Sequence, residues 1–249
     1  MDHHYSGKTF SILGDSISTL EGYNPEKFPV FYYTRYDVRA GVKTIMDTWW
    51  GKVINYFEGR FLVNNSWAKS RVTRIYGAAA DFPSACSDER TGGLHLGRVM
   101  PDVIFVYMGT IDWCCHVPTA GFTQSLFAEP IPIFRYGYEA MLQKIRTNYP
   151  DSEVWCCTLG RGDLSKGVSF QYPYLYTGPY AGRELEEYNS EIRNAARENQ
   201  CGLIDLYNCA TPYETIDGVH PTKKGMLTIA ETVIQEMLCK DRNDSPGGA

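Results

Sequence analysis

Short apolar segments alternate with amphipathic segments along most of this chain of 249 residues. The apolar segments are rich in β-branched and aromatic residues, which favours β-strands, and they lie at 8–14, 61–65, 102–108, 153–159 and 202–207. The segments between them carry apolar residues at a spacing of three to four, which predicts helices at 47–58, 135–148, 182–199 and 222–239. This alternation is typical of a parallel sheet covered by helices.

Parallel strands need crossover connections, which are usually right-handed and helical and lie on the faces of the sheet. We therefore expect an α/β fold, a three-layer α/β/α sandwich around a five-stranded parallel sheet. The length suits one domain, which we place at residues 1–240. The polar segment 241–249, which contains glycine and proline, is predicted to be a flexible tail.

The charge balance limits the classes of partner. The formal net charge is −5, whereas binding to nucleic acid or to an anionic membrane favours a clustered basic face. No apolar run approaches the length of a membrane-spanning helix, and the first residues do not resemble a signal peptide. We therefore expect a cytoplasmic protein that binds neither nucleic acid nor membrane. The sequence does not indicate the oligomeric state.

Polar residues suited to acyl transfer follow two of the predicted strands. Ser16 comes directly after the first strand, and Asp217 and His220 lie in the loop after the last. Ligands of open parallel sheets bind beyond the carboxyl ends of the strands, so these three side chains are expected to meet at one edge. A serine hydroxyl needs a base to remove its proton, and the base needs an acid to orient it. The three residues therefore predict a nucleophile, its base and its acid.

Each of these residues also has an ordinary structural interpretation. A serine after a strand often caps a helix, Asp217 can cap the last helix or its preceding turn, and His220 before a proline can be a surface residue. These ordinary roles would have to coincide at one edge by chance. The coincidence favours the catalytic interpretation.

Four segments, in chain order, resemble the sequence blocks of the SGNH (GDSL) hydrolase superfamily. They lie at 10–16, which contains Gly14-Asp15-Ser16, and at 64–71, 106–113 and 217–221. The resemblance implies a flavodoxin-like SGNH-hydrolase fold and an esterase that works through an acyl-enzyme. It also implies that Ser16 attacks an acyl carbonyl, that His220 passes its proton to the leaving alcohol, and that Asp217 orients the imidazole.

The same resemblance implies an oxyanion hole with three donors, and this chain departs from the family pattern at two of them. The backbone amide of Ser16 supplies the first. The family has a glycine at the second position, where this chain has Lys69 or its neighbour Ala68, and the amide survives if the turn needs no positive φ. The third donor is an asparagine side chain, which Ile111 replaces. Loss of one such donor typically lowers turnover about a hundred-fold to a thousand-fold.

Neighbouring positions complete the predicted oxyanion and substrate-binding set. These are Asp15, Gly109 and Trp113. A substitute for the missing third donor is left open, with Asn64, Asn65 and Ser66 as candidates.

Three long connections, at 22–44, 67–101 and 111–134, are expected at the same edge of the sheet. Their aromatic residues can shape a substrate-binding rim or pack the loops down. These residues include Tyr23, Phe28, Phe31, Tyr32, Tyr33, Trp113, Phe122 and Phe127. Arg71, Arg74 and Arg90 can likewise bind a polar substrate such as a sugar, or form pairs inside the loop.

Together these observations predict a carboxylic-ester hydrolase that needs no cofactor and no metal ion. The expected substrate is a small-molecule or carbohydrate ester that loses a short acyl group such as acetyl. Two alternatives stay open. One is a lipase-type or thioesterase-type enzyme. The other is a catalytically impaired family member that binds a glycan or acylated ligand without turning it over. The motive for this alternative is Ile111, which lacks the side-chain amide of the family's asparagine.

Overall fold

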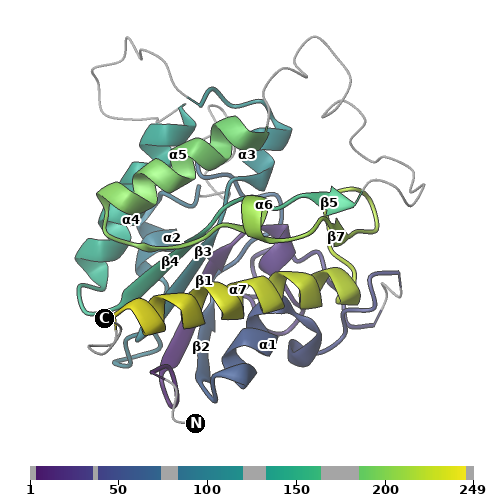
Figure 1. The fold of residues 1–249 in the computed structure, drawn as a ribbon, viewed down its shortest axis with the longest axis horizontal. Coiled ribbons are helices and arrows are strands. Elements are labelled where there is room, and N and C mark those ends of the chain that lie inside the picture. The colour runs from purple at the N-terminus through teal and green to yellow at the C-terminus, as the bar shows by residue number, and fades with distance from the viewer. Residues whose placement is uncertain (1–3, 36–38, 74–83, 120–132, 164–184, 245–249) are drawn as a thin grey trace.

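A five-stranded parallel sheet forms the centre of the computed structural model, which describes residues 4–35, 39–73, 84–119, 133–163 and 185–244 (Figure 1). In spatial order the strands are β2 (Arg60–Asn64), β1 (Thr9–Gly14), β3 (Val103–Tyr107), β4 (Glu153–Cys157) and β6 (Gly202–Ile204). Each neighbouring pair is parallel. The predicted parallel sheet is therefore confirmed.

Helices cover both faces of this sheet, which confirms the three-layer architecture. On one face α1 (Trp49–Tyr56) packs against α7 (Lys223–Asp244), and on the other α4 (Phe134–Asn148) packs against α5 (Leu185–Glu198) and α2 (Asp88–Gly92) (Figure 1). No helix in the described part of the chain is both long enough and apolar enough to cross a membrane.

The two central strands explain the continuous apolar runs in the sequence. Every residue of β1 and β3 is buried, because helices cover these strands from both sides. Phe10 of β1 stacks on Phe105 of β3 with ring centroids 5.7 Å apart, and Trp49 of α1 meets Phe105 edge-on at 5.5 Å. The edge strand β2 is only partly buried.

The elements differ from the sequence predictions mainly at their ends. The last strand ends at Ile204 and not at residue 207, because Asp205 caps a short helix, α6 (Leu206–Cys209), by accepting a hydrogen bond from the Asn208 amide. Helix α7 continues to Asp244, so the first part of the predicted tail at 241–249 is helical. Residues 245–249 and residues 182–184 of the third predicted helix, at 182–199, lie outside the described residues.

A second, two-stranded sheet lies close to the predicted His220 loop. Strands β5 (Gly162–Asp163) and β7 (Tyr213–Glu214) pair in parallel. A Cβ atom at Gly162 would come within 2.3 Å of the Gly218 carbonyl oxygen. The backbones at Gly162 and Gly218 therefore lie closer together than a residue with a side chain would allow. This small sheet places the loop at 217–220 against the segment that follows β4.

Candidate active site

The nucleophile turn directly follows β1. Ser16 begins a single turn of 3₁₀ helix, Ser16–Ser18, and the Asp15 carboxylate caps it by accepting a hydrogen bond from the Ile17 amide at 3.0 Å. A Cβ atom at Gly14 would lie 2.6 Å from the Ser18 Cβ and 2.8 Å from the Ser66 hydroxyl oxygen. Only glycine permits this reversal of the chain, and the reversal leaves Ser16 at the carboxyl end of the sheet.

The loop after β7 folds the Asp217 carboxylate back onto its own backbone. One carboxylate oxygen accepts hydrogen bonds from the amides of Val219 at 3.0 Å and His220 at 2.8 Å. Gly218 takes a φ of 92°, and its amide donates to the Thr215 hydroxyl. The other Asp217 oxygen is thereby directed at His220 Nδ1, at 2.6 Å.

The three predicted catalytic side chains meet across the fold. His220 Nε2 lies 2.9 Å from the Ser16 hydroxyl oxygen, although the two residues are 204 positions apart in the chain. Ser16, Asp217 and His220 are 2%, 6% and 3% exposed. The arrangement can take a proton from the serine at one edge of the imidazole while the other edge is held by a carboxylate.

The two acidic residues of these motifs have opposite electrostatic environments. Burial favours a higher pKa for Asp217, but hydrogen bonds from the His220 ring and from the His220 and Val219 amides outweigh it and lower the pKa. Burial raises the pKa of Asp15, and hydrogen bonds from Thr110 and the Ile17 amide only partly oppose this effect. The carboxylate that faces the imidazole is therefore the one held in its charged form.

The second sequence block contains a strained turn. Lys69 is exposed and takes a φ of 68°, in the left-handed region that normally favours glycine. The amide of Ala68 donates to the Pro29 carbonyl oxygen at 2.9 Å, which leaves Lys69 as the candidate donor of this block. The turn therefore does need a positive φ, and this chain makes it with lysine.

The third block enters a short helix that the sequence analysis did not predict. Gly109, at a φ of 123°, begins α3 (Thr110–Cys114), and the ring of Phe134 lies 3.0 Å from where a Cβ would stand. Ile111 is half-buried in the first turn of this helix and has no side-chain donor. Trp113 is buried and belongs to the hydrophobic core. Gly109 and Trp113 thus hold α3 in place.

Asp112 joins this helix to the two residues that directly follow the second block. Its carboxylate accepts hydrogen bonds from the Val72 amide at 2.7 Å, the Thr73 amide at 3.1 Å and the Thr73 hydroxyl at 2.7 Å. Burial raises the pKa of Asp112 to about 6, although these donors and the charge of Arg71 favour the carboxylate. A carboxyl group with a raised pKa therefore connects α3 to the end of the second block.

Two of the three proposed substitutes for the third oxyanion donor donate to other groups. The Asn64 side-chain amide donates to the Ser18 carbonyl oxygen at 2.7 Å, and that of Asn65 donates to the Arg90 carbonyl oxygen at 2.9 Å. The Ser66 hydroxyl is buried beside Gly14 and has no hydrogen-bond partner among the described residues. Neither asparagine replaces the amide that Ile111 lacks.

Arg90 lies inside the protein, so it neither reaches a substrate nor forms an ion pair within its own loop. The side chain is fully buried and donates to the Ser70 hydroxyl at 2.7 Å, the Gly14 carbonyl at 3.1 Å and the Asn65 carbonyl at 2.9 Å. Burial lowers its pKa to about 9. Arg90 thereby connects the ends of β1 and β2 with the turn that carries Lys69. Arg74 lies outside the described residues.

The aromatic residues of the first long connection pack around these motifs. Phe28 stacks on Trp67 with ring centroids 4.0 Å apart, and both are buried. The Tyr32 hydroxyl donates to the Pro221 carbonyl at 2.9 Å, and Phe31 lies on the His220 ring. Tyr23 and Tyr33 are 38% and 41% exposed. Phe122 and Phe127 lie outside the described residues.

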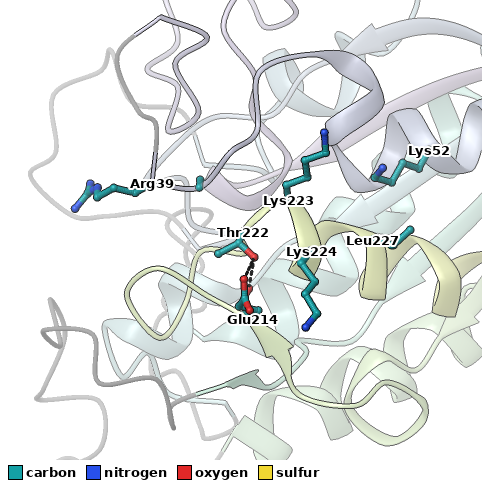
Figure 2. Close-up of a pocket in the computed structure, with 8 residues that line it drawn as sticks. Arg39, Lys52, Glu214, Thr222, Lys223, Lys224 and Leu227 are labelled. Carbon is teal, nitrogen blue, oxygen red and sulfur yellow. Dashed lines mark hydrogen bonds between the residues drawn. The ribbon is translucent and has the colours of Figure 1, made fainter.

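A hollow of about 400 Å³ lies away from the triad, at the start of α7 (Figure 2). Besides Lys52, the hollow has three cationic side chains, Arg39, Lys223 and Lys224, which Figure 2 shows pointing in different directions. Lys223 pairs with Asp47 at 2.6 Å, and Glu214 accepts a hydrogen bond from Thr222. These groups do not converge on one ligand. Within the described ranges, no three His, Cys, Asp or Glu side chains gather as a metal site requires.

Comparison with known families agrees with the motifs. Residues 8–168 match the model of the GDSL-like lipase/acylhydrolase family. The chain belongs to this family. The matched segment contains Ser16 and the blocks with Lys69 and Ile111, while the His220 loop follows it. No curated protein matches the chain in sequence.

Solved structures share the fold over nearly the whole chain. A GDSL-like protein of Bacteroides ovatus is 25% identical, with a TM-score of 0.69, and the match covers 95% of this chain and 99% of that one. A GDSL-like protein of Bacteroides uniformis is 22% identical, with a TM-score of 0.68 and coverage of 92% and 94%. The carbohydrate acetylesterase Est24 of Sinorhizobium meliloti is 14% identical, with a TM-score of 0.61 and coverage of 94% and 99%.

The left-handed backbone at Lys69 predicts an unusual response to glycine. Lys69→Gly removes a conformational strain of about 1 kcal/mol, which offsets the greater entropy of glycine in the unfolded chain, so stability should be unchanged or rise by up to about 1 kcal/mol. Lys52→Gly, inside helix α1, is the matched control and should cost about 1 kcal/mol. Urea unfolding measures both, and an equal loss in the two variants would contradict the prediction.

The raised pKa of Asp112 predicts a pH-dependent stability. The folded protein binds this proton more tightly than the unfolded chain, so the contribution of Asp112 falls as pH rises from about 4 to about 6. The difference between the two pKa values corresponds to about 3 kcal/mol. Asp112→Asn should be less stable at low pH, because an amide cannot accept all three hydrogen bonds, but should lose this pH dependence. Urea unfolding at several pH values between about 4 and about 6 tests this prediction. An equal dependence of the free energy of unfolding on pH in the wild type and in Asp112→Asn would refute it.

Proposed function

We propose that this family member is a serine-dependent carboxylic-ester hydrolase that removes short acyl groups, such as acetyl, from carbohydrate or other small polar esters. The pair of short contacts from Asp217 to His220 and from His220 to Ser16 carries the proposal. Membership of the GDSL-like family supports hydrolysis of an ester. The shared fold with a carbohydrate acetylesterase supports the substrate class.

The contacts define the proton transfers of this reaction. His220 Nε2 accepts the proton of the Ser16 hydroxyl as its oxygen forms a bond to the acyl carbon. The Asp217 carboxylate, kept charged by its lowered pKa, stabilises the imidazolium. His220 then gives the proton to the leaving alcohol oxygen as the ester bond breaks. A water molecule repeats the sequence, passing its proton to His220 while it attacks the acyl-enzyme, and Ser16 leaves with a proton.

The oxyanion donors proposed for this reaction are the backbone amides of Ser16 and Lys69. Both turns are held by Arg90, through the Gly14 carbonyl that precedes the first and the Ser70 hydroxyl that follows the second. Ile111 leaves the third position without a donor. We therefore expect the enzyme to turn over its substrate more slowly than a family member with the asparagine.

A second candidate function is binding of a glycan or acylated ligand without efficient turnover. Ile111 favours it, because one oxyanion donor is missing and neither Asn64 nor Asn65 replaces it. The intact contacts of Ser16, His220 and Asp217 favour the hydrolase, since a pure binding protein has no need of them. A lipase-type or thioesterase-type enzyme is distinguished from the proposed one by acyl-chain length.

Hydrolysis of an activated acetyl ester tests the proposed mechanism. Ser16→Ala should lower kcat by at least about a thousandfold, because no acyl-enzyme can form. Ile111→Asn should raise kcat by about tenfold or more, because it restores a donor to the developing oxyanion. Ile111→Leu, which adds no donor, is the control and should leave kcat within about twofold of the wild type. Equal rates for the wild type and Ser16→Ala would refute the hydrolase.

The length of the acyl group tests the substrate class. The proposed substrate carries a short acyl group such as acetyl, and a site suited to a short group discriminates against longer chains. Turnover of activated esters from acetyl to octanoyl should therefore decrease, with kcat/KM for octanoyl at least about tenfold below that for acetyl. An increase with chain length would instead identify a lipase-type or thioesterase-type enzyme.

A further inference from the structure

Phe31 covers one face of the imidazole of His220. The two ring centroids lie 3.5 Å apart, and the ring planes differ by 5°. Asp217 and Ser16 contact the edges of the imidazole, at Nδ1 and Nε2, so they fix its position within the ring plane. Phe31 contacts the face and is half-buried. Its stack therefore restricts the tilt of the ring, which the two edge contacts leave free.

Hydrogen bonds hold Phe31 to the nucleophile turn. The Phe31 amide donates to the Thr19 hydroxyl oxygen at 2.8 Å, and the same hydroxyl donates to the Ser16 carbonyl oxygen at 2.9 Å. Thr19 is fully buried. One hydroxyl group thus joins the backbone of the nucleophile to the backbone of the residue that stacks on the base.

The next residue holds the same segment to the histidine loop. The Tyr32 hydroxyl donates to the carbonyl oxygen of Pro221, directly after His220, at 2.9 Å, and the Tyr32 carbonyl accepts from the Glu21 amide at 2.9 Å. Phe31 and Tyr32 therefore connect the two motifs that lie at opposite ends of the sequence. The stack is part of a built contact between them.

An aromatic face treats the two protonation states of the imidazole differently. The face of a benzene ring carries partial negative charge and attracts a cation, whereas a neutral ring gains little from it. In a desolvated site this attraction favours the cation by about threefold to thirtyfold. The proposed reaction converts the imidazole into imidazolium as Ser16 attacks, so a face that prefers the cation lowers the barrier.

We propose that Phe31 is a positioning residue of this site, which fixes the plane of the His220 ring and stabilises its protonated form by face-to-face stacking. Its contribution to catalysis rests on the proposed hydrolase function. Its effect on the protonation of His220 does not, and can be measured without turnover.

Other charged groups near the imidazole stay the same when Phe31 is changed. Among the described residues, Asp217 faces it from its own loop and Asp15 acts on it from the nucleophile turn. The Cys114 thiol of α3 lies near both carboxylates. A change in the titration of His220 in a Phe31 variant therefore reports on the stack.

The test compares Phe31→Leu with Phe31→Tyr in the full chain. Leucine keeps an apolar cover over the imidazole but removes the aromatic face, and tyrosine restores that face. An NMR titration follows the His220 ring, which is identified among the five histidines by the loss of its signal in His220→Asn. The midpoint should move to lower pH by about 0.5 to 1 pH unit in Phe31→Leu and stay at the wild-type value in Phe31→Tyr. Circular dichroism checks that each variant is folded.

Kinetics with an activated acetyl ester give the second readout. In Phe31→Leu, kcat should fall by about tenfold with little change in KM, and the acidic limb of the kcat/KM profile should move to lower pH. Phe31→Tyr should keep kcat and the acidic limb of the profile at their wild-type values. Tyr136→Leu removes an aromatic residue that is 44% exposed on α4 and should change neither.

The outcomes separate the two proposals. A midpoint that is unchanged, or higher, in Phe31→Leu would overturn the role of Phe31, because access of water and not the aromatic face would then control protonation. The wild type can also lack esterase activity while the NMR midpoint of His220 is lower in Phe31→Leu than in the wild type. This result would overturn the hydrolase and support the stabilisation of the protonated ring by Phe31.

Discussion

The crowded chain reversal at the end of β1 is the constraint on which the rest of the site depends. Backbone at Gly14 passes so close to Ser18 and Ser66 that a Cβ atom has no room. The Gly14 carbonyl accepts hydrogen bonds from the Trp67 amide and from the buried Arg90 guanidinium. These contacts fix the direction in which Ser16 leaves the sheet. The distance of its hydroxyl from His220 follows from that direction.

The pKa values of the buried carboxylates around this turn are shifted in opposite directions, upward by burial in two of them and downward by hydrogen bonds in the third. Burial raises the pKa of Asp15 and of Asp112. Asp217 is also buried, yet donors from its own loop and from the His220 ring lower its pKa. The acid that faces the base is therefore the one whose charged form is favoured by its hydrogen bonds. The other two carboxylates hold turns together, Asp15 at Ser16–Ser18 and Asp112 between α3 and the second block.

This family member retains the proton-transfer contacts and departs from the family pattern where the oxyanion would be stabilised. Lys69 adopts the backbone conformation that the family makes with glycine, so its amide is kept at the expense of strain. The backbone at Ile111 cannot compensate in the same way, because the donor that the family has at this position is an asparagine side chain and not a backbone amide. In the proposed reaction Phe31 acts on a different step, the change of charge on His220. Its stack and the proposed oxyanion donors would therefore contribute to the rate independently.

The pattern of apolar residues was enough to predict the parallel α/β/α fold and the edge at which Ser16, Asp217 and His220 meet, because apolar periodicity and the succession of strands and helices along the chain are local properties. The sequence also identified Lys69 and Ile111 as departures. It left open whether Arg90 binds substrate, whether the aromatic residues form a rim, and whether the Lys69 turn needs a positive φ. Only the tertiary structure decided that Arg90 is internal, that Phe31 lies on His220 and that α7 runs to Asp244. The physical reason is that these contacts depend on how loops distant in sequence pack against each other, and no local pattern encodes that packing.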